Sequence, residues 1–166
     1  MMEPQPTEPL LTIDGEVESP LHLSFADCAA LAPAVQLIDV SQLDPKRSGD
    51  ALRLAGLLEL ARPRAGAQWL NLHASRDDFH AGIPLADVRE RAIVIYRLDG
   101  APLPAKAGGP FRFFIPDFAA CHSAEIDECA NVKYVDRIEV SSRRGFDNRP
   151  HDAAEHAELH RREAAE

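Results

Sequence analysis

The sequence predicts an α+β fold, in which a mixed β-sheet is packed with a few short helices. The chain has 166 residues, enough for one domain whose core needs no disulfide or metal. Short apolar runs bounded by glycine and proline recur along it and are typical of buried or half-buried strands. Between these runs, segments beginning at Ser24 and Gly49 have the capping residue or the apolar stripe of a helix.

Composition and charge exclude several classes of partner. The chain has 18 Lys and Arg against 27 Asp and Glu, a net charge of −9, and no strongly basic stretch. Nucleic acids and anionic membrane surfaces are therefore poor candidate partners. No segment has the pattern of a signal peptide or the length of a membrane span. We therefore expect a cytoplasmic protein that acts on a small molecule, with a redox partner if it is an enzyme.

Three parts of the chain differ in composition. Residues 1–9 contain three prolines and two glutamates and are expected to form a flexible lead-in. Residues 10–142 contain the apolar runs and form the predicted domain. Residues 143–166 are a charged tail, with a helix expected from Asp152 onward.

The first half of the predicted domain begins with a strand and turn over Leu10–Val17. A helix follows, with Ser24 as its N-cap and Asp27 three residues later, and it places Cys28 on its apolar face as a small buried residue. A strand over Val35–Val40 comes next. Gly49–Ala61 then has a strong apolar stripe and ends before a proline, which predicts a core helix.

The middle of the chain predicts two further strands joined by a loop. Gln68–Ala74 alternates, with Trp69 on one face and leucines on the other. Ser75–Leu85 is expected to be a loop, bracketed by His73 and His80. No thiol or carboxylate spacing around these histidines makes a metal pattern, so ordinary hydrogen-bonded or exposed histidines are expected. A short helix over Ala86–Glu90, a strand over Arg91–Leu98 and a turn at Asp99-Gly100 follow.

The stretch from Gly108 to Val140 carries the clearest pattern. A Gly-Gly-Pro turn opens the apolar run Phe111–Ile115, in which Arg112 is the only charged side chain, and a proline ends it. A second strand is expected over Val132–Val140, where most apolar residues share one parity. Asp136 breaks this alternation, which predicts a bulge there.

These two strands carry a resemblance to a known family. Gly109-Pro110-Phe111-Arg112, followed by Lys133-Tyr134 and an Ile138 strand, resembles the end of the molybdopterin-binding domain of sulfite-oxidase-like oxidoreductases. The similarity extends over about Leu10 to Val140. It implies a mixed sheet with a barrel-like core and the molybdenum cofactor, molybdopterin with its metal, as ligand.

The resemblance also implies where that cofactor would bind. Arg112, Lys133 and the turn at Gly108 and Gly109 would lie near it. Guanidinium and ammonium groups are the side chains that bind phosphate and oxyanions, and the cofactor carries a phosphate. The alternative is that both cations point to solvent from strand edges.

The chain departs from the family pattern at one important place. Active members hold molybdenum with a cysteine in the loop that corresponds to Asp39–Gly49, and this loop contains none. Ser41 offers an oxygen there, but a serine that caps its own loop is the favoured interpretation. The chain is thus interpreted as a compact member that lacks the usual molybdenum-ligating cysteine.

A second candidate metal site contains Cys121, His122 and Cys129. Thiolate and imidazole are natural ligands of zinc and iron, but this spacing matches no common zinc motif and a fourth ligand is missing. The three cysteines, an odd number, fit reduced thiols better than a disulfide framework. His156 and His160 have helical spacing in the tail, where a charged terminal helix is favoured over a zinc site.

The sequence leaves three functional hypotheses open. The first is a molybdopterin-dependent oxidoreductase acting on a small oxyanion or sulfur compound. The second is a non-catalytic descendant of that fold that serves as a binding module. The third is a small zinc or iron protein that uses the Cys121 loop.

Overall fold

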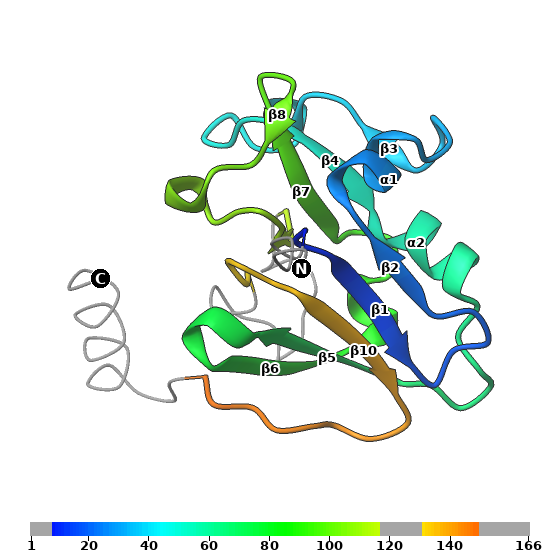
Figure 1. Ribbon diagram of the computed structural model, residues 1–166. Coiled ribbons are helices and arrows are strands. Elements are labelled where there is room, and N and C mark those ends of the chain that lie inside the picture. Colours follow the sequence, from blue (N-terminus) through cyan, green and yellow to red (C-terminus); the bar gives the residue numbers. More distant parts are fainter. Residues whose placement is uncertain (1–7, 117–130, 150–166) are drawn as a thin grey trace, which may run out of the picture.

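The computed structural model describes residues 8–116 and 131–149 and confirms an α+β fold (Figure 1). The described residues form two five-stranded sheets with short helices at their ends, and neither of these sheets closes into a barrel. The strands are β1 Leu11–Gly15, β2 Leu21–Leu23, β3 Gln36–Leu37, β4 Asp50–Arg53, β5 Trp69–Ala74, β6 Phe79–Pro84, β7 Ile93–Leu98, β8 Ala101–Pro102, β9 Arg112–Phe114 and β10 Arg137–Ser141. The helices are α1 Phe25–Ala29, α2 Leu54–Ala61 and α3 Leu85–Val88, with 3-10 turns η1 Val40–Gln42, η2 Ser75–Asp77 and η3 Ala105–Ala107.

The first sheet has the strand order β2-β1-β10-β5-β6. Strand β10 lies between β1, to which it is parallel, and β5, to which it is antiparallel. The other neighbouring pairs in this sheet are antiparallel. In Figure 1 this sheet forms the lower layer. Strand β10, from the end of the domain, therefore joins β1 to the β5–β6 hairpin.

The second sheet is built around β7. Strand β4 pairs with one edge of β7, while β8 and β9 both pair with the other. The β4–β7 pairing places Asp50 opposite Arg97, and the Arg97 Nε donates to the Asp50 carboxylate at 2.8 Å. The inner faces of the two sheets share one core, to which the first sheet contributes Ile13, Leu72 and Ile138 and the second Leu52 and Phe113.

Two sequence predictions about the N-terminal part are confirmed in detail. Ser24 caps α1, where its hydroxyl accepts from the Asp27 N–H and its own N–H donates to the Asp27 carboxylate. Cys28 on this helix is fully buried. Burial, together with the nearby charge of Asp27, raises the pKa of its thiol to about 12, so it is a neutral core residue.

Other predictions about local structure are wrong. The helix expected over Gly49–Ala61 begins only at Leu54, because Asp50–Arg53 is strand β4. Ala51 and Leu52 point to opposite sides of this strand and both are buried, so their apolar run follows from burial on two faces. The loop expected over Ser75–Leu85 contains strand β6, which pairs with β5 along its whole length.

The last predicted strand is shorter than expected. Strand β10 begins at Arg137, and the irregularity expected at Asp136 is a turn in which Tyr134 has a left-handed φ of 59°. Val132 and Val135 are both buried although they differ in parity, because the chain turns between them. None of the helices within residues 8–116 and 131–149 is long and apolar enough to cross a membrane.

Residues 143–149, which the composition assigns to the tail, pack against the β5–β6 hairpin (Figure 1). We call them the C-terminal segment. The Asn71 side chain accepts from the Gly145 N–H at 2.8 Å and donates to the Arg143 carbonyl at 3.3 Å. A side chain at Gly82 would lie 2.7 Å from Arg144, so a glycine there leaves room for the segment. The segment thereby covers β6.

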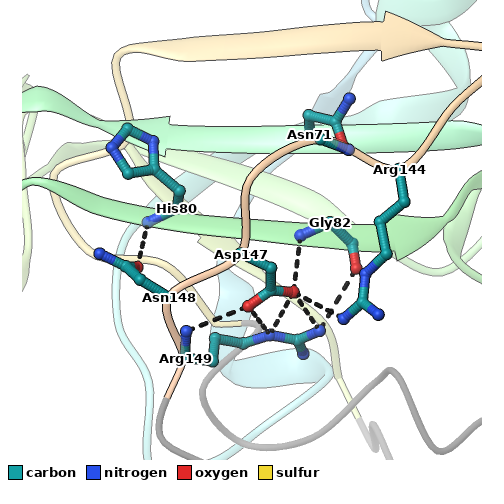
Figure 2. Close-up of polar contacts among 8 residues, drawn as sticks. Asn71, His80, Gly82, Arg144, Asp147, Asn148 and Arg149 are labelled. Atoms are coloured by element: carbon teal, nitrogen blue, oxygen red, sulfur yellow. Dashed lines mark hydrogen bonds and ion pairs between the residues drawn. The ribbon is translucent and has the colours of Figure 1, made fainter.

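Asp147 and Arg149 fasten this segment through a buried ion pair (Figure 2). The two side chains are only 7% and 5% exposed, and their closest atoms are 2.7 Å apart. Asp147 also accepts from the Gly82 N–H at 3.0 Å. Burial alone would raise the pKa of Asp147, but the hydrogen bonds from Arg149 and Gly82 outweigh it and hold the pKa well below its usual value.

We expect Asp147→Asn to destabilise the protein by about 3 kcal/mol, because it removes the counter-charge that Asp147 provides to the buried Arg149. Since the pKa of Asp147 is lowered in the folded state, its contribution is present at neutral pH and is lost as the pH falls toward that value. Urea unfolding at pH 7 checks the magnitude.

The matched control is Glu18→Gln, because Glu18 pairs with Arg62 on the surface at 3.7 Å. This substitution should change the free energy of unfolding by less than about 0.5 kcal/mol. Equal, small losses in both variants would show that the Asp147 pair contributes no more than a surface pair.

Candidate functional site

Three of the four residues predicted to lie near a cofactor converge in the structure. Gly108 follows η3 with a left-handed φ of 95°. A Cβ atom there would lie 3.0 Å from Cδ of Arg112 and 3.1 Å from Cγ of Lys133. The Gly108 carbonyl also accepts from the Tyr134 N–H at 2.8 Å. Glycine at this position therefore lets the Arg112 strand and the Lys133 turn approach each other.

Gly109 lies at a close approach between two parts of the backbone. A Cβ atom there would lie 1.8 Å from the Leu103 carbonyl oxygen, so only glycine allows the chain to pass Leu103. The Gly109-Pro110 peptide bond that follows is cis. Gly109 thus shapes the turn that leads into β9 and positions Arg112.

Arg112 is partly buried and incompletely paired. Its Nη1 donates to the Ala107 carbonyl at 3.3 Å, while its Nε is buried and has no hydrogen-bond partner. Burial lowers the pKa of this guanidinium, and the nearby charge of Arg47 lowers it further. A buried N–H donor without a partner, close to a second cation, is costly unless an anion accepts from it.

Arg47 is a site residue that the sequence analysis missed. Its guanidinium lies 5.1 Å from the ring centroid of Phe114, which is on β9 beside Arg112. Like Arg112, it has a buried Nε without a hydrogen-bond partner, and Asp44 is 3.9 Å from that atom. Its loop is the one in which active relatives are expected to carry cysteine, and an arginine in a short polar loop gives no periodic signal.

Lys133 and Arg76 complete the group. Lys133 is exposed, and the turn that carries it holds Tyr134 in a left-handed conformation that costs an aromatic residue about 1–3 kcal/mol. Two contacts hold Tyr134 there, the hydrogen bond to Gly108 and the Arg76 guanidinium, 4.2 Å from the ring centroid. We refer to Arg47, Arg76, Arg112 and Lys133 as the cationic cluster.

The donors of the cationic cluster fit the phosphate-bearing organic part of molybdopterin. Guanidinium groups donate strong, directed hydrogen bonds to phosphate and oxyanions, and an exposed ammonium adds a mobile positive charge. The unpartnered Nε atoms of Arg47 and Arg112 are the hydrogen-bond donors that such an anion would satisfy.

The described residues offer no thiolate for molybdenum. Ser41, in the loop where relatives are expected to have cysteine, bonds through its N–H and its hydroxyl to the Asp39 carboxylate, as expected of a residue that caps its own loop. Cys28 is a buried neutral thiol. Cys121, His122 and Cys129 lie outside the described residues, as does the tail after Arg149. Within residues 8–116 and 131–149, no three His, Cys, Asp or Glu side chains are arranged to hold a metal.

His73 and His80 are hydrogen-bonded, as expected from the sequence. They lie opposite each other on β5 and β6, with their Nδ1 atoms 2.8 Å apart. Glu139 accepts from His73 and Asp78 from His80. Lying between two carboxylates, this pair is separate in character from the cationic cluster.

Comparison with known proteins identifies the family. The family model described as the oxidoreductase molybdopterin binding domain matches residues 50–148, more than half of the chain. Among solved structures, the sulfane dehydrogenase SoxCD from Paracoccus pantotrophus is similar with a TM-score of 0.58 and 18% identity. That match covers 82% of this chain and 39% of the SoxCD chain. A search of curated proteins finds no match.

The family match and the structural likeness agree with the fold and with the position of the candidate site. The family match includes Gly108, Arg112 and Lys133, and the structural likeness confirms the sulfite-oxidase-like fold. The chain therefore belongs to the oxidoreductase molybdopterin-binding domain family.

Proposed function

We propose that this domain binds the molybdenum cofactor through the cationic cluster and acts as an oxidoreductase on a small oxyanion or sulfur compound. The observation that supports this best is the pair of buried Nε donors on Arg47 and Arg112, neither of which has a hydrogen-bond partner. The chain is acidic as a whole, so an anion is not attracted by net charge. Local donors have to provide the affinity.

Each member of the cluster has a distinct role in this proposal. Arg112 and Arg47 donate to the phosphate of the cofactor or to an oxyanion substrate, and Lys133 adds an exposed ammonium. Gly108 keeps the space between Arg112 and Lys133 free of a side chain. Arg76 acts indirectly, because it packs on Tyr134 and holds the turn that carries Lys133. When bound, the cofactor supplies a redox-active molybdenum for oxygen-atom or electron transfer.

A sulfur compound as substrate is supported by the name of a protein with this fold. SoxCD is a sulfane dehydrogenase, although this chain spans only 39% of the SoxCD chain and its likeness concerns the fold. Sulfur oxyanions and phosphate both present negatively charged oxygen atoms bound to one central atom. The same guanidinium donors would recognise either ligand.

A second candidate function is a cofactor-binding module without catalysis. The absence of a thiolate among the described residues favours it, because the metal would then lack the usual protein sulfur ligand. Both proposals require the cationic cluster. They differ in whether turnover accompanies bound cofactor. A zinc or iron site that uses Cys121, His122 and Cys129 remains a prediction from the sequence.

Cofactor retention tests the proposal directly. The protein is purified from a host that makes the cofactor, molybdenum, zinc and iron are quantified together, and the released pterin is measured by fluorescence. Arg112→Ala should retain roughly 10- to 100-fold less molybdenum and pterin than the wild type, because a charge-assisted hydrogen bond contributes about 1.5–3 kcal/mol.

Arg89→Ala is the matched control, since Arg89 lies on the surface after α3, outside the cluster. It should retain as much cofactor as the wild type, and both variants should keep the wild-type circular dichroism spectrum. Undiminished retention by Arg112→Ala would exclude the role given to Arg112. Zinc or iron without molybdenum would shift attention to the Cys121 loop.

The unpartnered donors also predict a change in stability without cofactor. Arg112→Met should stabilise the cofactor-free protein by about 1 kcal/mol, because it removes a partly buried cation beside Arg47. Added inorganic phosphate should raise the melting temperature of the wild type and raise that of Arg112→Met by much less.

The control for this prediction is Arg97→Met. Arg97 is also partly buried, but its Nε pairs with Asp50 at 2.8 Å. This variant should lose stability and keep the wild-type response to phosphate. If Arg112→Met were as damaging as Arg97→Met, the Arg112 guanidinium would have to be satisfied within the protein.

A further inference from the structure

The hydrogen bonds of the His73–His80 pair need more protons than two neutral imidazoles carry. Three hydrogen bonds lie in series. His73 Nε2 is 3.0 Å from Glu139, the two Nδ1 atoms are 2.8 Å apart, and His80 Nε2 is 2.8 Å from Asp78. Each bond needs one proton, and two neutral imidazoles carry two. Carboxylates carry none.

The third proton has to be bound by the pair itself. Two neutral rings can satisfy only two of the three bonds. Either both Nε2 atoms donate to the carboxylates and the two Nδ1 lone pairs face each other, or one Nδ1 donates to the other and one Nε2 lone pair faces its carboxylate. With one ring protonated, all three bonds form, and the positive charge lies between two carboxylates. The arrangement is therefore complete only with one extra proton.

The C-terminal segment is attached to the same residues. The His80 N–H donates to the Asn148 side chain at 2.8 Å (Figure 2). The Asn148 N–H donates to the His80 carbonyl at 3.0 Å. The Asn148 side chain also donates to the Asp78 carbonyl at 2.6 Å. The Phe146 ring lies 5.4 Å from the His80 ring, on which it packs. The segment is thus bound by the backbone of His80 and Asp78, and the Asp78 carboxylate is in turn bonded to the His80 ring, which links the histidine pair to the segment.

Other charged groups around the pair already have partners. Arg137 pairs with Asp14 and Glu139, and within the segment Arg144 and Arg149 both pair with Asp147. Asp136 accepts from the Ser75 N–H. The charged groups of the adjoining turn are Arg76, Asp77 and Asp78. The charged groups on the side of β10 and the turn are therefore more often acidic than basic.

We propose that His73 and His80 form a proton-binding site that fastens the C-terminal segment to β6. In this state the folded protein holds one proton more than two neutral histidines. The attachment is complete at acidic pH and weakens as the pH rises and the proton leaves. The test uses cofactor-free protein, so that its outcome does not depend on cofactor binding.

The experiment measures hydrogen exchange at the amides of His80 and Asn148 from about pH 5 to 8, corrected for the intrinsic rate. In the wild type, protection should fall by roughly ten-fold over this range. Imidazole ¹⁵N NMR should show three protons on the four ring nitrogens at the acidic end and two at the other. Two protons throughout, with protection unchanged, would overturn the proposal.

Asp78→Asn gives the decisive comparison. An amide at this position can donate to His80 Nε2, which lets a neutral His80 donate from Nδ1 to His73 and completes all three bonds without an extra proton. Asp78 is 89% exposed and has a left-handed φ of 48°, which asparagine tolerates. In this variant, protection of the His80 and Asn148 amides from hydrogen exchange should therefore become independent of pH and remain high.

The control is His22→Gln, which removes an exposed histidine on β2 that contacts only Thr12. It should keep the wild-type pH dependence. An Asp78→Asn variant with the same pH dependence as the wild type would show that the pair does not hold the additional proton.

Discussion

The position of β10 between β1 and β5 is the constraint on which the rest of this structure depends. Its pairings join the first strand of the domain to the β5–β6 hairpin, and Ile138 and Val140 fill the core beneath them. The turn before β10 carries Lys133 to Gly108, and the segment after it covers β6. Glu139 on its outer face supports His73. One strand thus positions part of the cationic cluster, the histidine pair and the C-terminal segment.

The cationic cluster has to act against the charge of its own protein. Charges separated by more than about 8 Å are largely screened at physiological salt, so the net charge of −9 reaches the site only weakly. Affinity for an anion then depends on donors within hydrogen-bond distance. Such donors are most effective where water competes least, and the Nε atoms of Arg47 and Arg112 are buried. Buried Nε atoms without a hydrogen-bond partner are unfavourable in the cofactor-free protein, and for the same reason they favour binding of an anionic ligand.

How much the sequence predicts depends on the range of the interactions that decide each element. The capping box at Ser24 and Asp27 and the turn at Asp99-Gly100 are local, and both are found as expected. Strand β4 was mistaken for the start of a helix, because burial on two faces gives an apolar run without a period of two. Strand β6 is not predicted, because its Ala81 and Gly82 have low strand propensity; Ala81 lies in the core, and Gly82 leaves room for the C-terminal segment.

In the candidate site, too, the sequence predicts the residues that lie close together in the chain and not those that long-range packing brings together. Family resemblance located Gly108, Arg112 and Lys133, because those residues lie in recognisable order around two strands. Arg47 and Arg76 come from loops far apart in the chain, and only the packing on Phe114 and Tyr134 brings them to the cluster. No spacing in a single sequence encodes such contacts. The partnerless Nε atoms are likewise visible only once the surroundings of each side chain are known.

The register of β1 with β10 also has a consequence for synthesis on the ribosome. Thr12 pairs with Arg137, so β1 emerges long before the strand that completes its sheet. At translation rates of 5–20 residues per second the delay is on the order of ten seconds. During this time β1 and β5 each expose an edge that the finished domain hides, and a nascent chain with open strand edges is prone to pair with others. The sheet can therefore be completed only after β10 has left the exit tunnel, and until then these edges are protected only by what binds the nascent chain.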